Sequence, residues 1–302
     1  MKIHIFGSLS GTEPMPDRHH TAWAIEYDGG LYWFDAGENG HRTAHLMGLD
    51  LLSVRTIAIS HPHIDHCGGL LNLLCAMRKL QWLKDDVKNF DIRMFLPNVK
   101  IWDHAAKLLE LMHENHHFTV QPAQIVDGKI FDDGKVSIEA RHNYHIQSPG
   151  AKEYDSFSFR IKAEGKTIVA SGDVRSYADM GDWLDECDLL LMETGHHKAS
   201  EVCAALRAEN RGVKDIIFIH HGRELLNDYD NALARAEKAW GAPVRAASDG
   251  STFELDINEN IHVCVTEIAE HRIESATVTV TRPIDEDEED KDKEKSSDKE
   301  AE

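Results

Sequence analysis

Long apolar runs are missing from this sequence. No stretch approaches the roughly 18 consecutive apolar residues that indicate a membrane-spanning helix. Residues 1–10 also lack the charged and then long apolar pattern of a secretory signal. We therefore expect a cytoplasmic protein with no membrane partner.

Cysteine is scarce and has no regular spacing. The chain holds five cysteines, and no two of them form a CxxC pair. Such a set favours neither a disulfide framework nor a thiolate zinc site. We therefore expect reduced thiols that are mostly buried.

Clusters of basic residues are absent as well, and the formal net charge is −20. Nucleic-acid binding normally requires a patch of lysine and arginine that neutralises phosphates. The charge therefore argues against structured nucleic acid as a partner and favours a small-molecule substrate. It leaves open whether the chain forms a homo-oligomer.

The last residues of the sequence are almost purely charged. Residues 285–302 contain eleven acidic and four basic residues. Such a segment cannot bury enough apolar area to offset the entropy that it would lose on ordering. The sequence therefore predicts an acidic disordered tail over 285–302 and a folded domain over 1–284.

The folded part alternates between hairpins and strand–helix units. Turn signals separate the hairpin strands, whereas apolar residues at helical spacing follow the later strands of each half. The pattern predicts strands at 2–7, 21–27, 30–35, 54–60, 92–96, 188–193 and 215–220. It predicts helices near 39–48, 70–83, 99–112, 200–210 and 229–240, and hairpins from 121 to 171. Both halves thus share one plan, and the predicted fold class is α/β.

Histidine is abundant, with twenty copies in the chain. Its densest run is His61-Pro62-His63-Ile64-Asp65-His66, directly after an apolar strand pattern. On an extended segment, His61 and His63 project to the same side and can hold one cation. Asp65 and His66, on the turn that follows, can face a second cation. Imidazole ligands with few carboxylates favour Zn²⁺, with Mn²⁺ or iron as alternatives.

This motif resembles the HxHxDH signature of the metallo-β-lactamase superfamily. Before it, Gly11-Thr12, Arg18 and the turn Asp35-Ala36-Gly37-Glu38 resemble the opening of the ribonuclease Z-like branch. After it, the strand that ends at Gly172-Asp173 and the segments DLLLMETGHHKASE and IIFIHHGRE resemble later parts of that branch. The resemblance implies a four-layer αβ/βα sandwich, with residues 1–284 as a hydrolase domain.

The resemblance also implies two divalent metal ions and their ligands. The first ion would be bound by His61, His63 and His145, with His142 as the alternative to His145. The second ion would be bound by Asp65, His66 and His220, with His221 as the alternative to His220. Asp173 would bridge the two ions.

Catalytic roles can be assigned as well, and the resemblance supports the one given to His197. A hydroxide that bridges the two ions would attack phosphorus or a carbonyl carbon, and Asp65 would orient it. His197 would supply a proton or support the site from outside the ligands. Arg223 would anchor a substrate phosphate or carboxylate, because its guanidinium can bind either group with two hydrogen bonds.

The chain also departs from ribonuclease Z. Met192 stands where the branch has a histidine, and His221-Gly222-Arg223 replaces a serine and a spaced arginine. The Gly- and Pro-rich arm that grips transfer RNA is missing, because residues 81–124 read as ordinary strand and helix. We therefore expect a dinuclear metal-dependent hydrolase that acts on a small phosphodiester or cyclic phosphate. A lactone, ester or thioester hydrolase is the alternative, and a non-catalytic metal-binding protein is the third interpretation.

Overall fold

The computed structural model describes residues 1–84, 89–112, 118–255 and 261–265. The predicted acidic tail over 285–302 lies outside the described residues, and so does the last part of the predicted domain, 266–284. No helix within the described residues is long and apolar enough to cross a membrane.

The first of two mixed sheets has eight described strands, in the order β15-β14-β1-β2-β3-β4-β5-β6. The strands β15 to β3 in this order are antiparallel, and β3 to β6 are parallel. The bounds are β1 (Lys2–Gly7), β2 (Ala22–Tyr27), β3 (Gly30–Phe34), β4 (Val54–Ala58), β5 (Phe90–Leu96), β6 (Phe118–Gln124), β14 (Ser251–Leu255) and β15 (Ile261–Val265).

The second sheet has seven described strands, in the order β13-β12-β11-β10-β9-β8-β7. Here β7 to β10 are antiparallel, and β10 to β13 are parallel. The bounds are β7 (Gly128–Asp132), β8 (Val136–His142), β9 (Phe157–Ala163), β10 (Lys166–Ala170), β11 (Cys187–Thr194), β12 (Val213–His221) and β13 (Arg245–Ala246).

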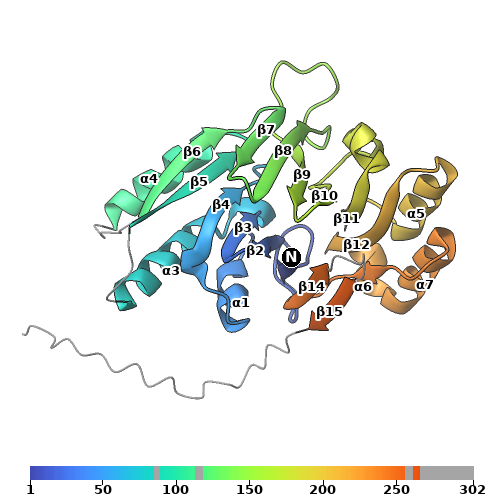
Figure 1. Ribbon diagram of the computed structural model, residues 1–302, viewed down its shortest axis with the longest axis horizontal. Helices are drawn as coiled ribbons and strands as arrows, with labels where there is room; N and C mark the ends of the chain where they lie inside the picture. Colours follow the sequence, from blue (N-terminus) through green and yellow to red (C-terminus); the bar gives the residue numbers. More distant parts are fainter. Residues whose placement is uncertain (85–88, 113–117, 256–260, 266–302) are drawn as a thin grey trace, which may run out of the picture. The chain divides into compact units, whose positions relative to one another are not determined.

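Helices cover the outer face of each sheet (Figure 1). On the first sheet these are α1 (Gly40–Leu46), η1 (Leu51–Ser53), α3 (Leu70–Leu83) and α4 (Lys100–Leu111). On the second sheet they are η2 (Tyr177–Asp185), α5 (Ala199–Ala208) and α7 (Tyr229–Trp240). Two short helices, α2 (Ile64–Cys67) and α6 (Arg223–Asn227), each follow a strand. The order of helix, sheet, sheet and helix confirms the predicted α/β class and the four-layer αβ/βα sandwich.

Alternation along the strands supplies the apolar contacts between layers. In β11, Leu189 and Leu191 lie in the core between the two sheets, together with Phe34 of β3. Leu190 and Met192 lie in a separate core beneath α5 and α7. Successive side chains of a strand point to opposite faces, so a strand that is apolar throughout serves a sheet covered on both sides.

The predicted hairpins from 121 onward are wrong at their beginning. Phe118–Gln124 forms β6, which pairs in parallel with β5 and lies at the edge of the first sheet. β6 can contain Pro122, which has no amide proton to donate, because the outer side of an edge strand forms no ladder hydrogen bonds. The hairpins begin at β7 instead.

A close contact between two loops supports the histidine motif. The amide of Gly69 donates to the Ala36 carbonyl at 2.7 Å. A Cβ on Gly69 would lie 2.2 Å from the Gly37 carbonyl oxygen, so only glycine permits this approach. The contact joins the loop after β3 to the loop after β4. The turn at Asp35 is thereby fixed beneath the segment that carries His61.

Candidate metal centre

The histidines and acids of the predicted site lie where strands end. His61 follows β4, His145 follows β8 and Asp173 follows β10. His220 lies near the end of β12, at the point where the register with β11 shifts between Ile219 and His221. The parallel strands of each sheet bring their carboxyl ends to one edge, which is where α/β proteins place their ligands. Side chains far apart in the sequence therefore meet.

The first group is His61, His63 and His145, whose ligand atoms lie within 4.8 Å of one another. His61 Nε2 is 3.0 Å from His63 Nδ1, and His145 Nε2 is 3.3 Å from that same atom. Three imidazole nitrogens that converge in this way form a typical site for a transition-metal ion.

The second group is Asp65, His66 and His220, and its ligand atoms also lie within 4.8 Å of one another. All three residues are buried. His66 Nε2 lies 3.7 Å from Asp65 Oδ2, and the rings of His66 and His220 have centroids 4.7 Å apart. This group offers two nitrogens and one carboxylate oxygen to a cation.

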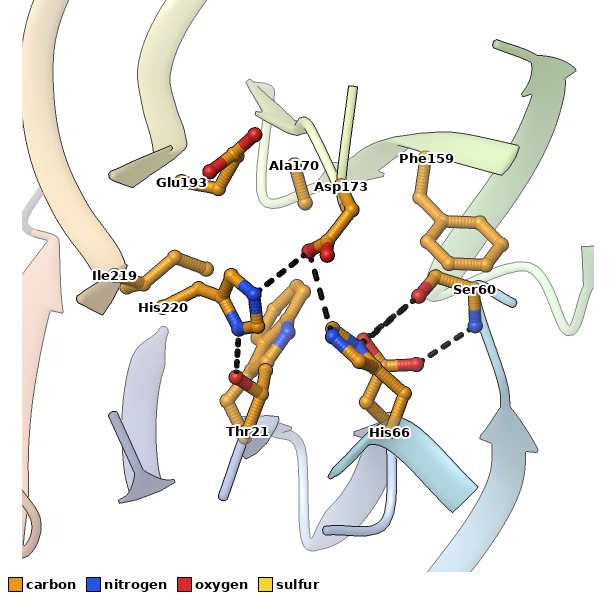
Figure 2. Close-up of a pocket in the computed structure, with 12 residues that line it drawn as sticks. Thr21, Ser60, His66, Phe159, Ala170, Asp173, Glu193, Ile219 and His220 are labelled. Atoms are coloured by element: carbon orange, nitrogen blue, oxygen red, sulfur yellow. Dashed lines mark hydrogen bonds and ion pairs between the residues drawn. The ribbon is translucent and has the colours of Figure 1, made fainter. Parts of the chain in front are cut away.

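Asp173 lies between the two groups. Its Oδ1 is 3.1 Å from His220 Nε2 and 3.4 Å from His66 Nε2, as the dashed lines in Figure 2 indicate. Its Oδ2 is 3.7 Å from both His61 Nε2 and His145 Nε2. One carboxylate therefore reaches both groups.

Unsatisfied polar atoms indicate that these groups fit divalent cations. Asp173 Oδ1 and His66 Nε2 are buried and accept or donate no hydrogen bond among the described residues. Buried polar atoms without a partner are costly, and a cation can bind both a carboxylate and an imidazole lone pair. Burial lowers the pKa of His61 well below its usual value, so this imidazole stays neutral, as a metal ligand must be.

The electrostatics of the second group also favour a cation. Burial opposes a charge on His66, but the carboxylates of Asp173 and Asp35 raise its pKa well above the usual value. This position therefore attracts positive charge. The fold and these residues together indicate that the protein binds divalent metal ions.

Hydrogen bonds on the outer nitrogens orient the imidazoles. His66 Nδ1 donates to Asp35 Oδ2 at 2.8 Å, and His61 Nδ1 lies 3.0 Å from the hydroxyl oxygen of Ser60. The Ser60 hydroxyl donates in turn to Asp35 at 2.9 Å. These partners leave the Nε2 lone pairs facing the site, which is the usual support for metal-binding histidines. Asp35 adopts a left-handed backbone with φ 53°, which places its carboxylate below both rings.

The alternative ligands lie outside both groups. His142 Nδ1 pairs with Asp127 Oδ2 at 2.6 Å, and its ring does not belong to a ligand group. His221 Nε2 donates to the Ala247 carbonyl at 2.7 Å, and its Nδ1 lies 3.0 Å from the Thr194 hydroxyl. Burial lowers the pKa of His221 to about 3, so this residue is a neutral structural histidine. The geometry thus favours His145 and His220 as ligands.

His196 faces Asp173, whereas His197 does not. His196 Nδ1 lies 3.8 Å from Asp173 Oδ2, and His197 Nε2 donates to the Val174 carbonyl at 3.0 Å. The buried carboxylate of Glu193 accepts hydrogen bonds from the amide and the ring of His196, at 2.8 and 3.1 Å. This hydrogen bond raises the pKa of His196. The sequence prediction chose His197, whereas the structure brings its neighbour His196 next to Asp173 and His145.

Arg223 is engaged at the surface. Its guanidinium pairs with the carboxylate of Glu13, and 61% of its side chain is exposed. Arg223 would have to leave Glu13 before it could bind a substrate phosphate. Its predicted role as an anchor therefore has no contact that supports it.

The loop between β1 and β2 contacts the second group from outside. The amide of Gly11 donates to Asp65 Oδ2 at 2.8 Å. His220 Nδ1 lies 2.5 Å from the hydroxyl oxygen of Thr21, and that hydroxyl donates to the Leu9 carbonyl. His220 itself has φ 51°, a left-handed value that needs such support. The loop therefore orients two of the three members of this group.

Asp249 holds both ends of that loop. Its carboxylate accepts a hydrogen bond from the Ser8 amide at 2.9 Å and another from the His19 amide at 2.6 Å. Arg18 adds bonds to the Ser8 hydroxyl and to the Ala247 carbonyl. No sequence motif pointed to Asp249. It contacts the candidate ligands only through the backbone of the loop, and such a contact leaves no pattern in the sequence.

We expect Asp249→Asn to weaken binding of the second metal ion by about 10-fold or more, the usual range for residues that support ligands. The amide keeps the size of the carboxylate but offers one acceptor oxygen in place of two. Competition with a chromogenic zinc chelator measures the affinity of each ion. Asp188→Asn is the matched control, because Asp188 accepts from the Thr167 amide in the second sheet away from the site. Unchanged affinity for both ions would contradict this prediction.

Comparisons with known proteins agree with the fold and the site. The family model described as a beta-lactamase superfamily domain matches residues 33–223. The ribonuclease Z of Nitrosopumilus maritimus is 25% identical over 273 residues, which cover 73% of this chain and 89% of the relative. The ribonuclease Z of Picrophilus torridus is 25% identical over 292 residues, with 79% and 91% coverage.

Solved structures share the fold at lower identity. Human tRNase Z, short form, superposes with a TM-score of 0.64 and 21% identity, covering 85% of this chain and all of that one. The metallo-β-lactamase fold protein YhfI from Bacillus subtilis gives 0.62 and 15%, with 84% and 99% coverage.

The relatives correct one expectation from the sequence. The prediction that structured nucleic acid is an unlikely partner is wrong, because relatives that span most of the chain are ribonucleases. The net charge of −20 is a sum over the whole chain and does not describe the local potential at a site that binds cations.

The family match covers the strands that carry the histidine motif, Asp173 and His220. The chain belongs to the metallo-β-lactamase superfamily, and it is a metal-dependent hydrolase of the ribonuclease Z-like branch.

Proposed function

We propose that this protein hydrolyses phosphodiesters with two divalent metal ions, Zn²⁺ being the ion that suits its ligands best. The observation that carries the proposal is the position of Asp173. Its Oδ1 lies 3.1 Å from His220 Nε2, and its Oδ2 lies 3.7 Å from His61 Nε2. A carboxylate within reach of both groups supports two neighbouring ions, the arrangement that suits displacement at phosphorus.

The ligand sets would divide the site in two. One ion would be held by His61, His63 and His145, the other by Asp65, His66 and His220, with Asp173 shared. When bound, the ions supply a nucleophile at neutral pH and neutralise charge that develops on the phosphate oxygens. Asp65 is held by the Gly11 amide, which donates to its Oδ2, and the carboxylate held in this way would orient the nucleophile.

His196 would give a proton to the leaving oxygen. Its ring lies beside Asp173, and 45% of its side chain is exposed. A proton donor must reach both the site and the solvent from which it recovers its proton. Glu193 would keep the ring in place through its bonds to the amide and Nδ1 of His196.

The ribonuclease Z relatives support an RNA strand as the physiological substrate. A small diester tests the same chemistry without the polymer. Both substrates present one negatively charged phosphate to the same groups.

Protein that is freed of metal with a chelator and reloaded with Zn²⁺ is expected to bind two equivalents and to hydrolyse bis-p-nitrophenyl phosphate. Elemental analysis measures the metal, and release of p-nitrophenolate measures turnover. His63→Ala is expected to keep one equivalent, because His63 belongs to the first group only. Hydrolysis of a lactone or thioester without any phosphodiester hydrolysis would overturn the proposal.

A further inference from the structure

A large cavity lies at the ends of β5, β6 and β8. Its volume is about 550 Å³, within the range of pockets that bind small molecules. The residues that matter for its chemistry are Lys100, Val126, His142, Lys152, Tyr154 and Phe157. None of them belongs to a ligand group.

Two links join this cavity to the metal centre. His142 lines the cavity, and His145 of the first group follows three residues later in the same loop. Phe157 also lines it, and its amide donates to the Ser60 carbonyl at 3.0 Å, next to His61. These two links place the cavity next to the loop that carries His145 and next to the residue before His61.

One wall of the cavity is aromatic and held in place. The rings of His142 and Tyr154 stack with centroids 4.0 Å apart and an interplanar angle of 20°. The Tyr154 hydroxyl accepts a hydrogen bond from the Gly150 amide at 2.9 Å, and Asp127 bonds to both the amide and the ring of His142. Hydrogen bonds therefore fix both rings before any ligand arrives, which lowers the cost of binding a planar group.

The remaining lining is mixed, with two lysines, Lys100 and Lys152, and two acidic residues, Asp127 and Glu153, of which Asp127 is already bonded to His142. Val126 is 63% exposed and lines the same cavity. Lys100 and Lys152 form no ion pair with a carboxylate among the described residues. A flat apolar face with free ammonium groups nearby suits a base that carries phosphate.

We propose that this cavity binds the nucleobase next to the scissile phosphate, with Tyr154 as its main stacking surface. This proposal rests on phosphodiester hydrolysis at the metal centre. The base stacks on the ring pair, and Lys100 and Lys152 lie where the next phosphate of a strand would pass. Stacking accepts any base, so the cavity contributes affinity with little preference for sequence.

Two chromogenic diesters with the same leaving group test the proposal. The p-nitrophenyl ester of thymidine 5′-phosphate carries a base, and methyl p-nitrophenyl phosphate does not. In the zinc-loaded protein, Tyr154→Ala is expected to raise KM for the nucleoside ester about 10-fold more than KM for the methyl ester, with kcat little changed. Tyr154→Trp should keep KM for the nucleoside ester close to that of the unsubstituted protein, because tryptophan also offers a stacking surface. Tyr177→Ala is the matched control, because Tyr177, the first residue of η2, donates to Glu209 after α5 and does not line the cavity.

Binding measurements without turnover separate the proposed base-binding cavity from the proposed phosphodiester hydrolysis. Calorimetry with adenosine monophosphate and with ribose 5-phosphate compares a ligand that has a base with one that lacks it. If Tyr154→Ala weakens only adenosine monophosphate while neither ester is hydrolysed, the subsite stands and the proposed function fails. If both esters are hydrolysed and Tyr154→Ala changes the two KM values equally or not at all, the subsite is wrong.

Discussion

Asp173→Ala is expected to lower kcat/KM for phosphodiesters on the order of 10³-fold or more. The change removes the carboxylate that lies 3.1 Å from His220 Nε2 and 3.7 Å from His61 Nε2. Without it, the two groups would lose the carboxylate that we propose they share, and the positive charge of the two proposed cations would go uncompensated. Steady-state kinetics and elemental analysis of the same sample measure the two effects.

Asp173→Asn distinguishes charge from shape. The amide fills the same space, so a loss of metal in this variant reports the missing negative charge. Asp188→Ala provides the control, since Asp188 also lies at the boundary of a second-sheet strand but bonds to the Thr167 amide and Lys214. An Asp173→Ala protein that kept both ions and full turnover would refute the bridging role.

His196→Ala is expected to lower kcat by about 10²- to 10⁴-fold for a diester whose leaving group is a ribose hydroxyl, the range for loss of a general acid. The same variant should hydrolyse p-nitrophenyl esters almost normally, because p-nitrophenolate leaves without a proton. His197→Ala is the neighbouring control, because His197 bonds to the Val174 carbonyl. The measurement is kcat for both leaving groups in the unsubstituted protein, in His196→Ala and in His197→Ala.

An equal loss for both leaving groups would show that His196 supports the ligands and does not donate a proton. A large, leaving-group-dependent loss in His197→Ala would assign the acid to His197. The two residues differ by one position, so these variants decide a question that the sequence alone leaves open.

Much of the fold could be predicted because its signals are local. The helices at 70–83 and 229–240 agree with α3 and α7 residue by residue, since their apolar spacing and the polar residues around them fix both ends. β6 could not be predicted in this way. It contains Pro122 and mostly exposed residues, and only its pairing with β5 makes it a strand.

The ligand motif could be recognised because a short segment provides four candidate side chains. His61, His63, Asp65 and His66 lie on one extended stretch and the helical turn after it, so their spacing already describes their geometry. The choice between His196 and His197 could not be made from the sequence for the opposite reason. Which of two adjacent histidines faces Asp173 depends on where β11 ends and α5 begins, and helix boundaries are the least certain part of a sequence prediction.

Contacts between distant segments gave no signal in the sequence. Asp249 reaches the site only through the backbone of Ser8 and His19, and Glu193 acts through His196. The average charge was misleading as well, because it counts every surface residue equally whereas binding depends on the local field.

The pairing of β14 with β1 has a consequence for the order of synthesis. Lys2 lies opposite Glu254 in this ladder, and Asp249 just before β14 fixes the loop that begins at Ser8. On the ribosome, the histidine motif emerges early and waits for partners that are translated much later. His220 and then Asp249 must leave the exit tunnel before the second group is supported. A nascent chain therefore remains an incomplete hydrolase until nearly all of the described fold has been made.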